Sequence, residues 1–329
     1  MTTLGRKLPH GPIVGIDLGG TNIQIGVVDD KARILGRAKD KTDPDNGMDA
    51  VFDRIVSGLR SAVADAGLKQ TDVLALGIGV PGPVDPFAGI VREAVNLRWT
   101  MAPVGTMLTE RLGMPVVVDN DVNVAVYGEA HHGAGIGARH LLGCWVGTGV
   151  GGGLILNGEL FYGHHFSAGE IGHVLLYPKN PPGTRSIEHN CSRTAIVDRL
   201  VHLIRTNRPS SLKNLLGDKF PRIKSKHIAE AYQAGDELVV EVVDDAADRL
   251  GTALGNFTTL LSLERIILGG GLTEAMQEPF VDRVRAAVHR VAFPAVCKEV
   301  QVVASELDDD AGVIGAALLA RERLAVASV

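Results

Sequence analysis

Two glycine-rich segments, one in each half of the chain, most constrain the fold. Residues 14–30 read VGIDLGGTNIQIGVVDD, and residues 145–159 read WVGTGVGGGLILNGE. In each segment an apolar strand leads into a short turn that contains glycine and threonine, and a second strand follows. After the first turn the apolar side chains recur at 23, 25 and 27, which is the period of a strand. Both segments are therefore predicted to form β-hairpins.

This pattern differs from two common phosphate-binding fingerprints. The dinucleotide-binding motif G-x-G-x-x-G opens a helix, whereas a strand follows Asn22, and no G-K-[ST] of a P-loop follows these glycines. A single hairpin is equally well explained as an ordinary turn, because paired glycines suit positive φ. Two such hairpins favour phosphate binding, since glycine lets backbone N–H groups approach an anion closely. A third segment, LGGGL at 268–272, follows a predicted strand and begins a helix, which would add further N–H groups.

Composition excludes several classes of protein. The 329 residues are 45% hydrophobic and 22% charged, which is typical of a soluble globular protein large enough for two domains. A net charge of −5 without a long basic run argues against a dedicated nucleic-acid binder. No apolar run reaches membrane-spanning length, and residues 1–12 lack the apolar region of a signal peptide. The scattered Cys144, Cys191 and Cys297 predict reduced thiols in a cytoplasmic protein.

Hydrophobic periodicity predicts two similar α/β halves. The predicted strands are 13–18, 23–29, 32–39, 72–80 and 115–121 in the first half, and 140–146, 154–158, 265–271 and 299–307 in the second. The predicted helices are 46–67, 104–112, 121–132, 191–206, 236–262, 273–291 and 311–325. Strands in succession followed by alternating helices and strands, occurring twice, indicate a duplicated unit.

The order of the motifs resembles the ROK family of sugar kinases and repressors, within the actin-like ATPase superfamily that includes hexokinase. The resemblance covers nearly the whole chain and is closest to the family's bacterial glucokinases. It rests on the segments DLGGTN, PGPVD, NLRW, DNDVNVAVYGE, GTGVGGGLILNG, AGEIGH, LGGGL and DDAGVIGAALLA. It implies a duplicated α/β fold of the actin-like ATPase (ribonuclease H-like) class, with two domains around a central cleft. We expect the domains at 1–122 and 123–310, with a helix at about 311–329 packing back on the first.

The resemblance also implies roles for particular residues. Asp121 matches the catalytic base, which takes a proton from the sugar hydroxyl as that hydroxyl attacks the phosphorus. The implied sugar ligands are Asn96, Asn120, Asp121, Glu170, His173 and Glu188. The implied nucleotide-binding residues are Asp17, Gly19, Gly20, Thr21, Asn22, Thr148, Gly149, Gly151, Gly269 and Gly270. Carboxylates, amides and imidazoles can pair with hydroxyls that both donate and accept hydrogen bonds. Positioning of the phosphoryl group would fall to the N–H hairpins and to Mg²⁺ bound with ATP.

Some of these residues have purely structural alternatives. Asp121 precedes a helical run and could simply cap it. Glu170 and His173 are three residues apart and could stabilise a local turn. The ordered set of motifs favours the sugar-binding role for both.

The resemblance leaves more than one activity open. Its main implication is ATP-dependent phosphorylation of a hexose, most simply glucose, at the 6-hydroxyl. Kinases for N-acetylmannosamine, N-acetylglucosamine or fructose share most of these residues, and polyphosphate is an alternative donor. A sugar-responsive repressor would need a DNA-binding segment, and only about a dozen residues precede IVGIDL. An actin- or chaperone-like ATPase would not need the sugar-ligand set. The family also implies a homodimer or homotetramer, with neither nucleic acid nor membrane as partner.

One family motif is missing from this sequence. In most ROK proteins a C-x-C-G-x-x-G-C segment, which holds structural zinc, follows the GEIGH histidine. Here His173 is followed by VLLYPKNPPGTRSIEHNCSRTAI, in which Cys191 lies after Glu188 and is the only cysteine. One cysteine and a nearby histidine do not provide the four ligands of a structural zinc site. We therefore predict no structural zinc, with the loop near 178–188 held by packing and by its prolines.

Overall fold

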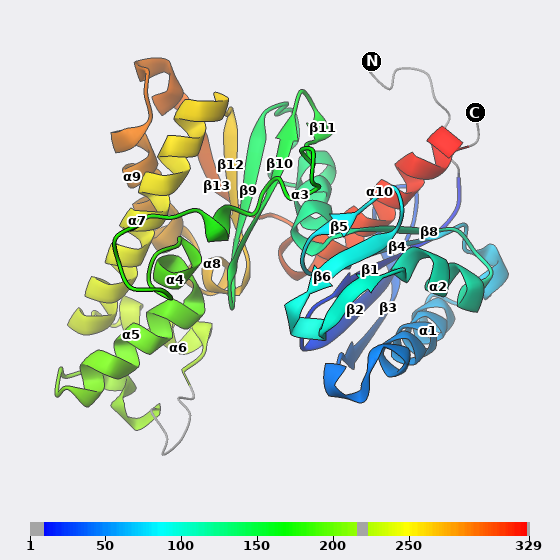
Figure 1. The fold of residues 1–329 in the computed structure, drawn as a ribbon, viewed down its shortest axis with the longest axis horizontal. Helices are drawn as coiled ribbons and strands as arrows, with labels where there is room; N and C mark the ends of the chain where they lie inside the picture. The colour runs from blue at the N-terminus through cyan, green and yellow to red at the C-terminus, as the bar shows by residue number, and fades with distance from the viewer. Residues whose placement is uncertain (1–9, 216–222, 328–329) are drawn as a thin grey trace. The chain divides into compact units, whose positions relative to one another are not determined.

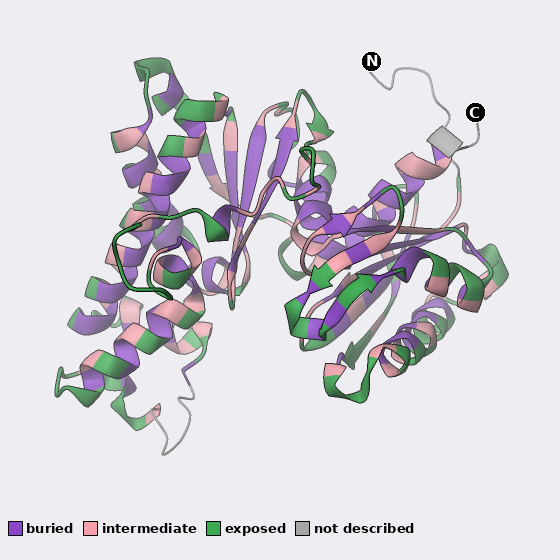
Figure 2. Ribbon diagram, in the orientation of Figure 1, coloured by how far each residue is buried: buried purple, intermediate pink, exposed green. Residues whose placement is uncertain are grey.

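The computed structural model describes residues 10–215 and 223–327, and its contacts divide the chain into two compact units. The first unit comprises residues 10–136, 162–168 and 309–327, and the second comprises 137–161, 169–215 and 223–308. Each unit is built on a five-stranded sheet, and Figure 2 shows that the central strands of both sheets are largely buried. Within the described ranges, no helix combines the length and the apolar character needed to cross a bilayer.

The first unit contains a sheet in the order β3-β2-β1-β4-β8 and a small sheet in the order β5-β6-β7 (Figure 1). Its strands are β1 (Ile13–Leu18), β2 (Asn22–Val28), β3 (Ile34–Lys41), β4 (Leu76–Val80), β5 (Val84–Asp85), β6 (Ile90–Ala94), β7 (Trp99–Ala102) and β8 (Val116–Asn120). Its helices are α1 (Met48–Asp65), α2 (Val104–Leu112), α3 (Asp121–His132) and α10 (Ala311–Ala327). β1 pairs antiparallel with β2 and parallel with β4, and β4 pairs parallel with β8.

Helices of the first unit pack against its main sheet through apolar or glycine surfaces. α1 buries Phe52, Ile55 and Leu59, at helical spacing, against β2 and β3. α10 packs against β1 and β4, and a Cβ atom at Gly15 of β1 would lie 1.9 Å from the backbone oxygen of Val313. Only glycine at this position lets the helix backbone approach the strand so closely. The beginning of α10 is thereby fixed against the middle of β1.

The second unit repeats the main sheet in the order β11-β10-β9-β12-β13. Its strands are β9 (Leu141–Val146), β10 (Val150–Leu156), β11 (Glu159–Leu160), β12 (Arg265–Gly269) and β13 (Gln301–Ala304). Its helices are α4 (Glu188–Cys191), α5 (Arg193–Arg205), α6 (Ser225–Gln233), α7 (Glu237–Leu261), α8 (Gly271–Met276) and α9 (Glu278–Val291). α7 and α9 lie side by side, as Figure 1 shows, and α9 also contacts β13.

The two sheets have the same topology. β9 pairs antiparallel with β10 and parallel with β12, as β1 pairs antiparallel with β2 and parallel with β4. The parallel pair β12–β13 corresponds in the same way to β4–β8. The glycine turns after β1 and after β9 therefore occupy equivalent positions. The predicted duplicated α/β architecture is confirmed in the strand order.

Several elements differ from the prediction. The second strand of this hairpin was expected at 154–158, after the turn residues 147–153, but β10 begins at Val150, so that the glycines at 151–153 lie inside the strand. The single helix expected at 273–291 is two helices, since Gln277 has a positive φ of 52° and Pro279 removes a backbone donor. The strand expected at 72–80 begins only at Leu76. Each difference lies at a glycine, a proline or an element boundary.

The division into units also differs from the expected boundary between residues 122 and 123. Helix α3 belongs to the first unit, because it packs against α10 and β4. A Cβ atom at Gly315 would lie 1.7 Å from the backbone oxygen of Val124, so α3 and α10 are in close contact. Residues 162–168 also join the first unit, although the chain on either side belongs to the second.

Candidate functional site

The turn after β1 is a short loop closed by backbone hydrogen bonds. The N–H of Gly19 donates to the backbone oxygen of Asn22 at 2.9 Å. Thr42, which is fully buried, donates from its hydroxyl to the backbone oxygen of Gly19 at 2.6 Å and from its N–H to that of Thr21 at 2.9 Å. Thr42 thus fixes both sides of the tip. Because it lies far along the chain, at the end of β3, the turn motif alone does not identify it.

Asn96 lies beside this first turn. A Cβ atom at Gly20 would be 3.1 Å from the Cβ atom of Asn96. Asn96 is placed there by the short 3₁₀ turn Val95–Leu97, between β6 and β7. The structure therefore brings one predicted sugar ligand next to a predicted nucleotide-binding residue within the first unit.

Asp17 is a half-buried carboxylate near the end of β1. Burial, reinforced by the negative charges of Asp121 and Asp309, raises the pKa of Asp17 to about 7. A Cβ atom at Gly312 would lie 2.9 Å from the Asp17 carboxyl carbon, so the beginning of α10 closes over this side chain. Such a group is destabilised when ionised and would be stabilised by a cation. Of the described residues, no cluster of three or more His, Cys, Asp or Glu has a geometry that would hold a metal by itself.

Asn120 and Asp121 stand where β8 ends and α3 begins. Asn120 is the N-cap residue, and its side-chain oxygen accepts hydrogen bonds from the N–H groups of Val122 at 2.9 Å and Asn123 at 3.0 Å. Its amide nitrogen donates to the backbone oxygen of Gly82 at 3.1 Å and to Asp121 Oδ1 at 2.9 Å. Val122 N–H also donates to Asp121 Oδ1. The cap is therefore Asn120 rather than Asp121, and two donors orient the Asp121 carboxylate.

The turn after β9 is held from the start of α5. Gly147 N–H donates to the backbone oxygen of Gly149 at 2.9 Å, which closes the turn. Arg193 donates from its guanidinium to Thr148 Oγ1 at 3.0 Å, and Thr194 donates from its hydroxyl to the Thr148 backbone oxygen at 2.7 Å. Arg193 and Thr194 were not predicted as site residues. Their contacts arise because Ser192 caps α5 and directs the first helical residues towards the turn.

Glu188, at the start of α4, is bound to this second turn. Its Oε2 atom accepts a hydrogen bond from Val150 N–H at 3.0 Å. A Cβ atom at Gly149 would lie 2.2 Å from the same oxygen, so glycine is required for the carboxylate to fit there. The structure thus joins a predicted sugar ligand directly to the predicted phosphate turn.

The loop before Glu188 is held by hydrogen bonds as well as by packing and prolines. Leu176 N–H donates to the Arg185 backbone oxygen at 2.8 Å, and Ile187 N–H donates to that of Val174 at 2.9 Å. The side chain of Asn190 donates to the Thr184 and Ser186 backbone oxygens, and accepts from Arg249 at 2.9 Å. Arg249 also lies over the ring of Tyr177. The expectation that packing and prolines alone hold the loop was therefore incomplete.

Glu170 and His173 lie on a short 3₁₀ turn against β10. Their nearest charged atoms are 3.9 Å apart, and His173 is the more exposed of the two. Burial raises the pKa of Glu170, an effect that His173 opposes and Glu188 reinforces. A Cβ atom at Gly152 would lie 2.7 Å from the Gly169 backbone oxygen. The lack of a side chain at Gly152 therefore lets the segment that leads into the 3₁₀ turn pack against β10. Glu170, His173 and Glu188 therefore share one region of the second unit.

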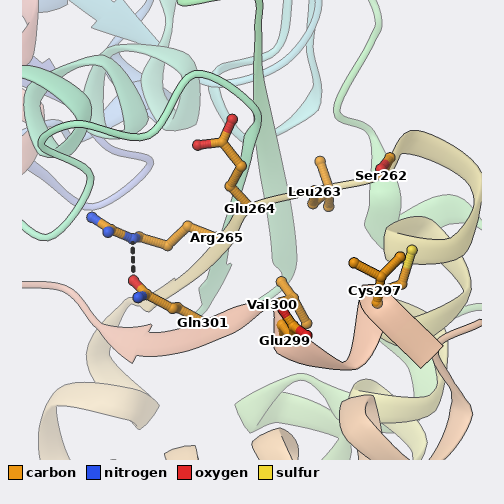
Figure 3. Close-up of a pocket in the computed structure, with 9 residues that line it drawn as sticks. Ser262, Leu263, Glu264, Arg265, Cys297, Glu299, Val300 and Gln301 are labelled. Carbon is orange, nitrogen blue, oxygen red and sulfur yellow. Dashed lines mark hydrogen bonds between the residues drawn. The ribbon is translucent and has the colours of Figure 1, made fainter. Parts of the chain in front are cut away.

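The remaining predicted residues and the pocket lie elsewhere in the second unit. Gly151 is in β10, opposite Trp145, while Gly269 ends β12 and Gly270 precedes α8 with a φ of 85°. A pocket lies near the beginnings of β12 and β13 and contains the hydrogen bond from Arg265 to Gln301 (Figure 3). None of the predicted sugar or nucleotide residues lines this pocket.

Comparison with known proteins identifies the family in which these features occur together. The ROK family profile matches residues 13–323. A glucokinase of Halalkalibacterium halodurans is 31% identical over 315 residues, covering 94% of this chain and 95% of that protein. A glucokinase of Thermotoga maritima is 32% identical over 321 residues, covering 96% and 99%.

A solved structure agrees with these matches. The crystal structure of a ROK family glucokinase from Streptomyces griseus in complex with glucose and AMPPNP has a TM-score of 0.82 at 33% identity, covering 95% of this chain and 100% of that one. This similarity confirms the predicted fold. The family match over almost the whole chain, together with the relatives above 30% identity, shows that this protein belongs to the ROK family.

Proposed function

We propose that this chain is an ATP-dependent sugar kinase that transfers the γ-phosphoryl group of ATP to the 6-hydroxyl of glucose. Membership of the ROK family and the glucokinase names of its relatives support the kinase activity. Glucose is the simplest substrate, because the solved relative was crystallised with glucose and AMPPNP. Burial of all three cysteines as free thiols agrees with a reducing, cytoplasmic setting.

The observation that carries the proposal is the junction of β8 and α3. Asp121 is held there by two donors to one carboxylate oxygen, and a general base requires such a fixed orientation. We propose that Asp121 takes the proton of the attacking hydroxyl. A primary hydroxyl is a poor nucleophile until a carboxylate begins to remove this proton.

The proposed binding residues divide between the two units. In the first unit, Asn96 and Asn120 would bind sugar hydroxyls, and the turn from Gly19 to Asn22 would bind phosphate. In the second unit, Glu170, His173 and Glu188 would bind sugar hydroxyls. The remaining proposed nucleotide contacts are Thr148, Gly149, Gly151, Gly269 and Gly270.

A divalent cation fits the first unit at Asp17. Burial and the negative charges of Asp121 and Asp309 raise the pKa of this carboxyl, so a nearby cation would stabilise its ionised form. Mg²⁺ bound with ATP would neutralise charge on the phosphates. The contribution of the protein is the carboxylate itself, half-buried and closely covered by the beginning of α10.

A coupled assay across a small panel of sugars tests the proposal. Purified protein should convert glucose and MgATP to glucose 6-phosphate and ADP. N-acetylmannosamine, N-acetylglucosamine, fructose and polyphosphate belong in the same panel, since they distinguish the alternative substrates and donor. If no sugar in the panel stimulates ATP consumption, the proposed kinase function is wrong.

A further inference from the structure

Asp119 is a buried carboxylate directly before Asn120 and Asp121. Its side chain is 1% exposed, yet it accepts hydrogen bonds from four donors of the first unit. Asn120 N–H donates to Asp119 Oδ1 at 2.8 Å, and the Asn123 side chain donates to the same oxygen at 3.2 Å. Both Oδ1 donors thus belong to the segment that contains Asn120 and Asp121.

The other oxygen of Asp119 is bound by two side chains from distant parts of the sequence. Tyr162 donates from its hydroxyl to Asp119 Oδ2 at 2.7 Å, and Arg323 of α10 donates to the same atom at 2.8 Å. Arg323 also donates to the Tyr162 hydroxyl at 2.6 Å and to the Pro86 backbone oxygen at 2.9 Å. Charge-assisted bonds of this kind fix a buried carboxylate in one orientation.

Tyr162 begins the segment 162–168, which belongs to the first unit although its neighbours in sequence belong to the second. Phe87 packs edge-on against Tyr162 and Phe166, and Arg92 lies over the Phe166 ring. Tyr162 and Phe166 are therefore both anchored to the first unit. From Ala168 the chain runs directly into Gly169 and Glu170.

We propose that Tyr162, Asp119 and Arg323 are positioning residues for the phosphoryl transfer, acting through Asn120 and Asp121. This inference rests on the proposed role of Asp121 as general base. Asp119 accepts hydrogen bonds from the backbone N–H of Asn120 and from the side chain of Asn123. Tyr162 and Arg323 in turn fix Asp119 by donating to its other oxygen. Because catalysis depends on the placement of the base to within a fraction of an ångström, loosening this network lowers the rate without removing any group that touches substrate.

The substitution Tyr162→Phe tests the network with least disturbance, because it removes one hydroxyl and keeps the ring that packs on Phe87. We expect kcat to fall about 10-fold and the KM for glucose to rise severalfold, while the KM for MgATP stays within about 2-fold. Tyr127→Phe is the matched control. The Tyr127 hydroxyl donates to Glu322 of α10 at 2.5 Å in the same unit, so Tyr127→Phe removes a partly buried tyrosine–carboxylate bond that does not involve Asp119.

A double substitution separates positioning from a general structural effect. In an Asp121→Asn protein, adding Tyr162→Phe should lower the residual rate less than about 2-fold, because the group it positions is already gone. If Tyr162 merely stabilised the fold, its replacement would lower Tm and would affect both backgrounds equally. Equal kcat values in Tyr162→Phe and Tyr127→Phe would overturn the proposal, as would an additive double mutant.

Crystal structures of the two tyrosine variants keep this test separate from that of the proposed function. If the wild-type protein phosphorylates no sugar, the proposed function fails on its own. The Asn120–Asp121 segment should nevertheless be displaced or less ordered in Tyr162→Phe and unchanged in Tyr127→Phe. An unchanged segment in both variants would overturn the positioning role.

Discussion

The turns after β1 and β9 are equivalent in topology but are supported by different chemistry. In the first unit a neutral hydroxyl, that of Thr42, holds the tip, and the nearby carboxylates, Asp17 and Asp121, raise each other's energy. In the second unit a carboxylate, Glu188, is bound to the turn itself, and Arg193 reaches Thr148. The duplicated scaffold thus supplies two equivalent glycine turns, while residues outside the repeat surround them differently. Under the proposed function, the first unit would serve proton and cation chemistry and the second would link sugar with nucleotide.

The largest effect should come from Asp121→Asn. If the first unit supplies the base, kcat should fall about 10²–10⁴-fold while glucose binding largely survives, because Asn can still hydrogen-bond a hydroxyl. Steady-state kinetics and calorimetric glucose titration measure the two effects. Asp72→Asn, which alters an exposed carboxylate bonded to Lys69 N–H in the same unit, should change neither. A folded Asp121→Asn protein with near-normal kcat would restrict Asp121 to a structural role.

The next effect concerns the charge on Asp17. A folded pKa of about 7, against an ordinary value of 3.8, means that ionisation opposes folding, so wild-type stability falls as pH rises through this window. The stability of Asp17→Asn relative to wild type should therefore grow by about 2–3 kcal/mol between about pH 5 and about pH 8. Urea unfolding of the ligand-free proteins measures this change. A pH-independent difference would contradict the raised pKa.

The same group predicts the pH dependence of nucleotide binding. Asp17 must lose its proton to bind a cation, so the wild-type KM for MgATP should fall as pH rises through about 7. In Asp17→Asn that dependence should vanish and the KM should be high throughout. Initial-rate measurements at saturating glucose, made on both proteins across this pH range, give the two KM profiles. Retention of the wild-type pH dependence in the variant would assign it to another group.

An intermediate effect should come from Glu188, because it joins two predicted functions in the second unit. Glu188→Ala removes the acceptor of Val150 N–H and the proposed sugar contact, and should raise the KM for both glucose and MgATP about 10-fold. Glu188→Gln keeps an acceptor and should raise the KM for MgATP less. If Glu188→Ala changes only the glucose KM, the bond to the turn has no bearing on nucleotide binding.

Smaller effects should follow from the supports of the two turns. Thr42→Val and Thr148→Val each remove one hydroxyl, and each should raise the KM for MgATP a few-fold and cost about 1 kcal/mol or less in stability. Chemical denaturation and kinetics should be measured together. Thr252→Val, on the exposed surface of α7, provides the control. Equal kinetics in all three variants would show that neither threonine supports nucleotide binding.

No effect at all is expected from removing zinc. The loop before Glu188 is held by Asn190, Arg249 and a backbone ladder, so a zinc chelator should leave Tm and the fold unchanged. Elemental analysis of protein purified without a histidine tag provides the measurement. One tightly held zinc per chain that survives dialysis would contradict the prediction. Activity should still require Mg²⁺, which arrives with ATP.

Sequence reasoning predicted best where hydrophobic periodicity is strong. The predicted bounds of α2 and α3, 104–112 and 121–132, match the structure. The small sheet β5-β6-β7 was missed, because its strands are two to five residues long and too short to show a period. The break at Gln277 was missed because the helical pattern continues across it.

The candidate site was predictable where residues follow strand ends. Asp17, Asn120 and Asp121 lie at or directly after such ends, and their motifs are local. The groups that hold them are not local: Thr42, Tyr162 and Arg323 come from distant segments and form no pattern with the residues they bind. Such partners are determined by tertiary packing, which one sequence does not reveal.

The return of α10 to the first sheet has a consequence for biosynthesis. Its contact with β1, made close by Gly15, and its contact with α3, made close by Gly315, join residues far apart in the sequence. While the ribosome is still translating residues before 311, one face of β1 and β4 has no covering helix. Nearly all of the second unit is by then available to fold. The second unit should therefore finish folding before the first. Products released before α10 is made would expose an apolar, glycine-lined sheet face and become substrates for chaperones and proteases.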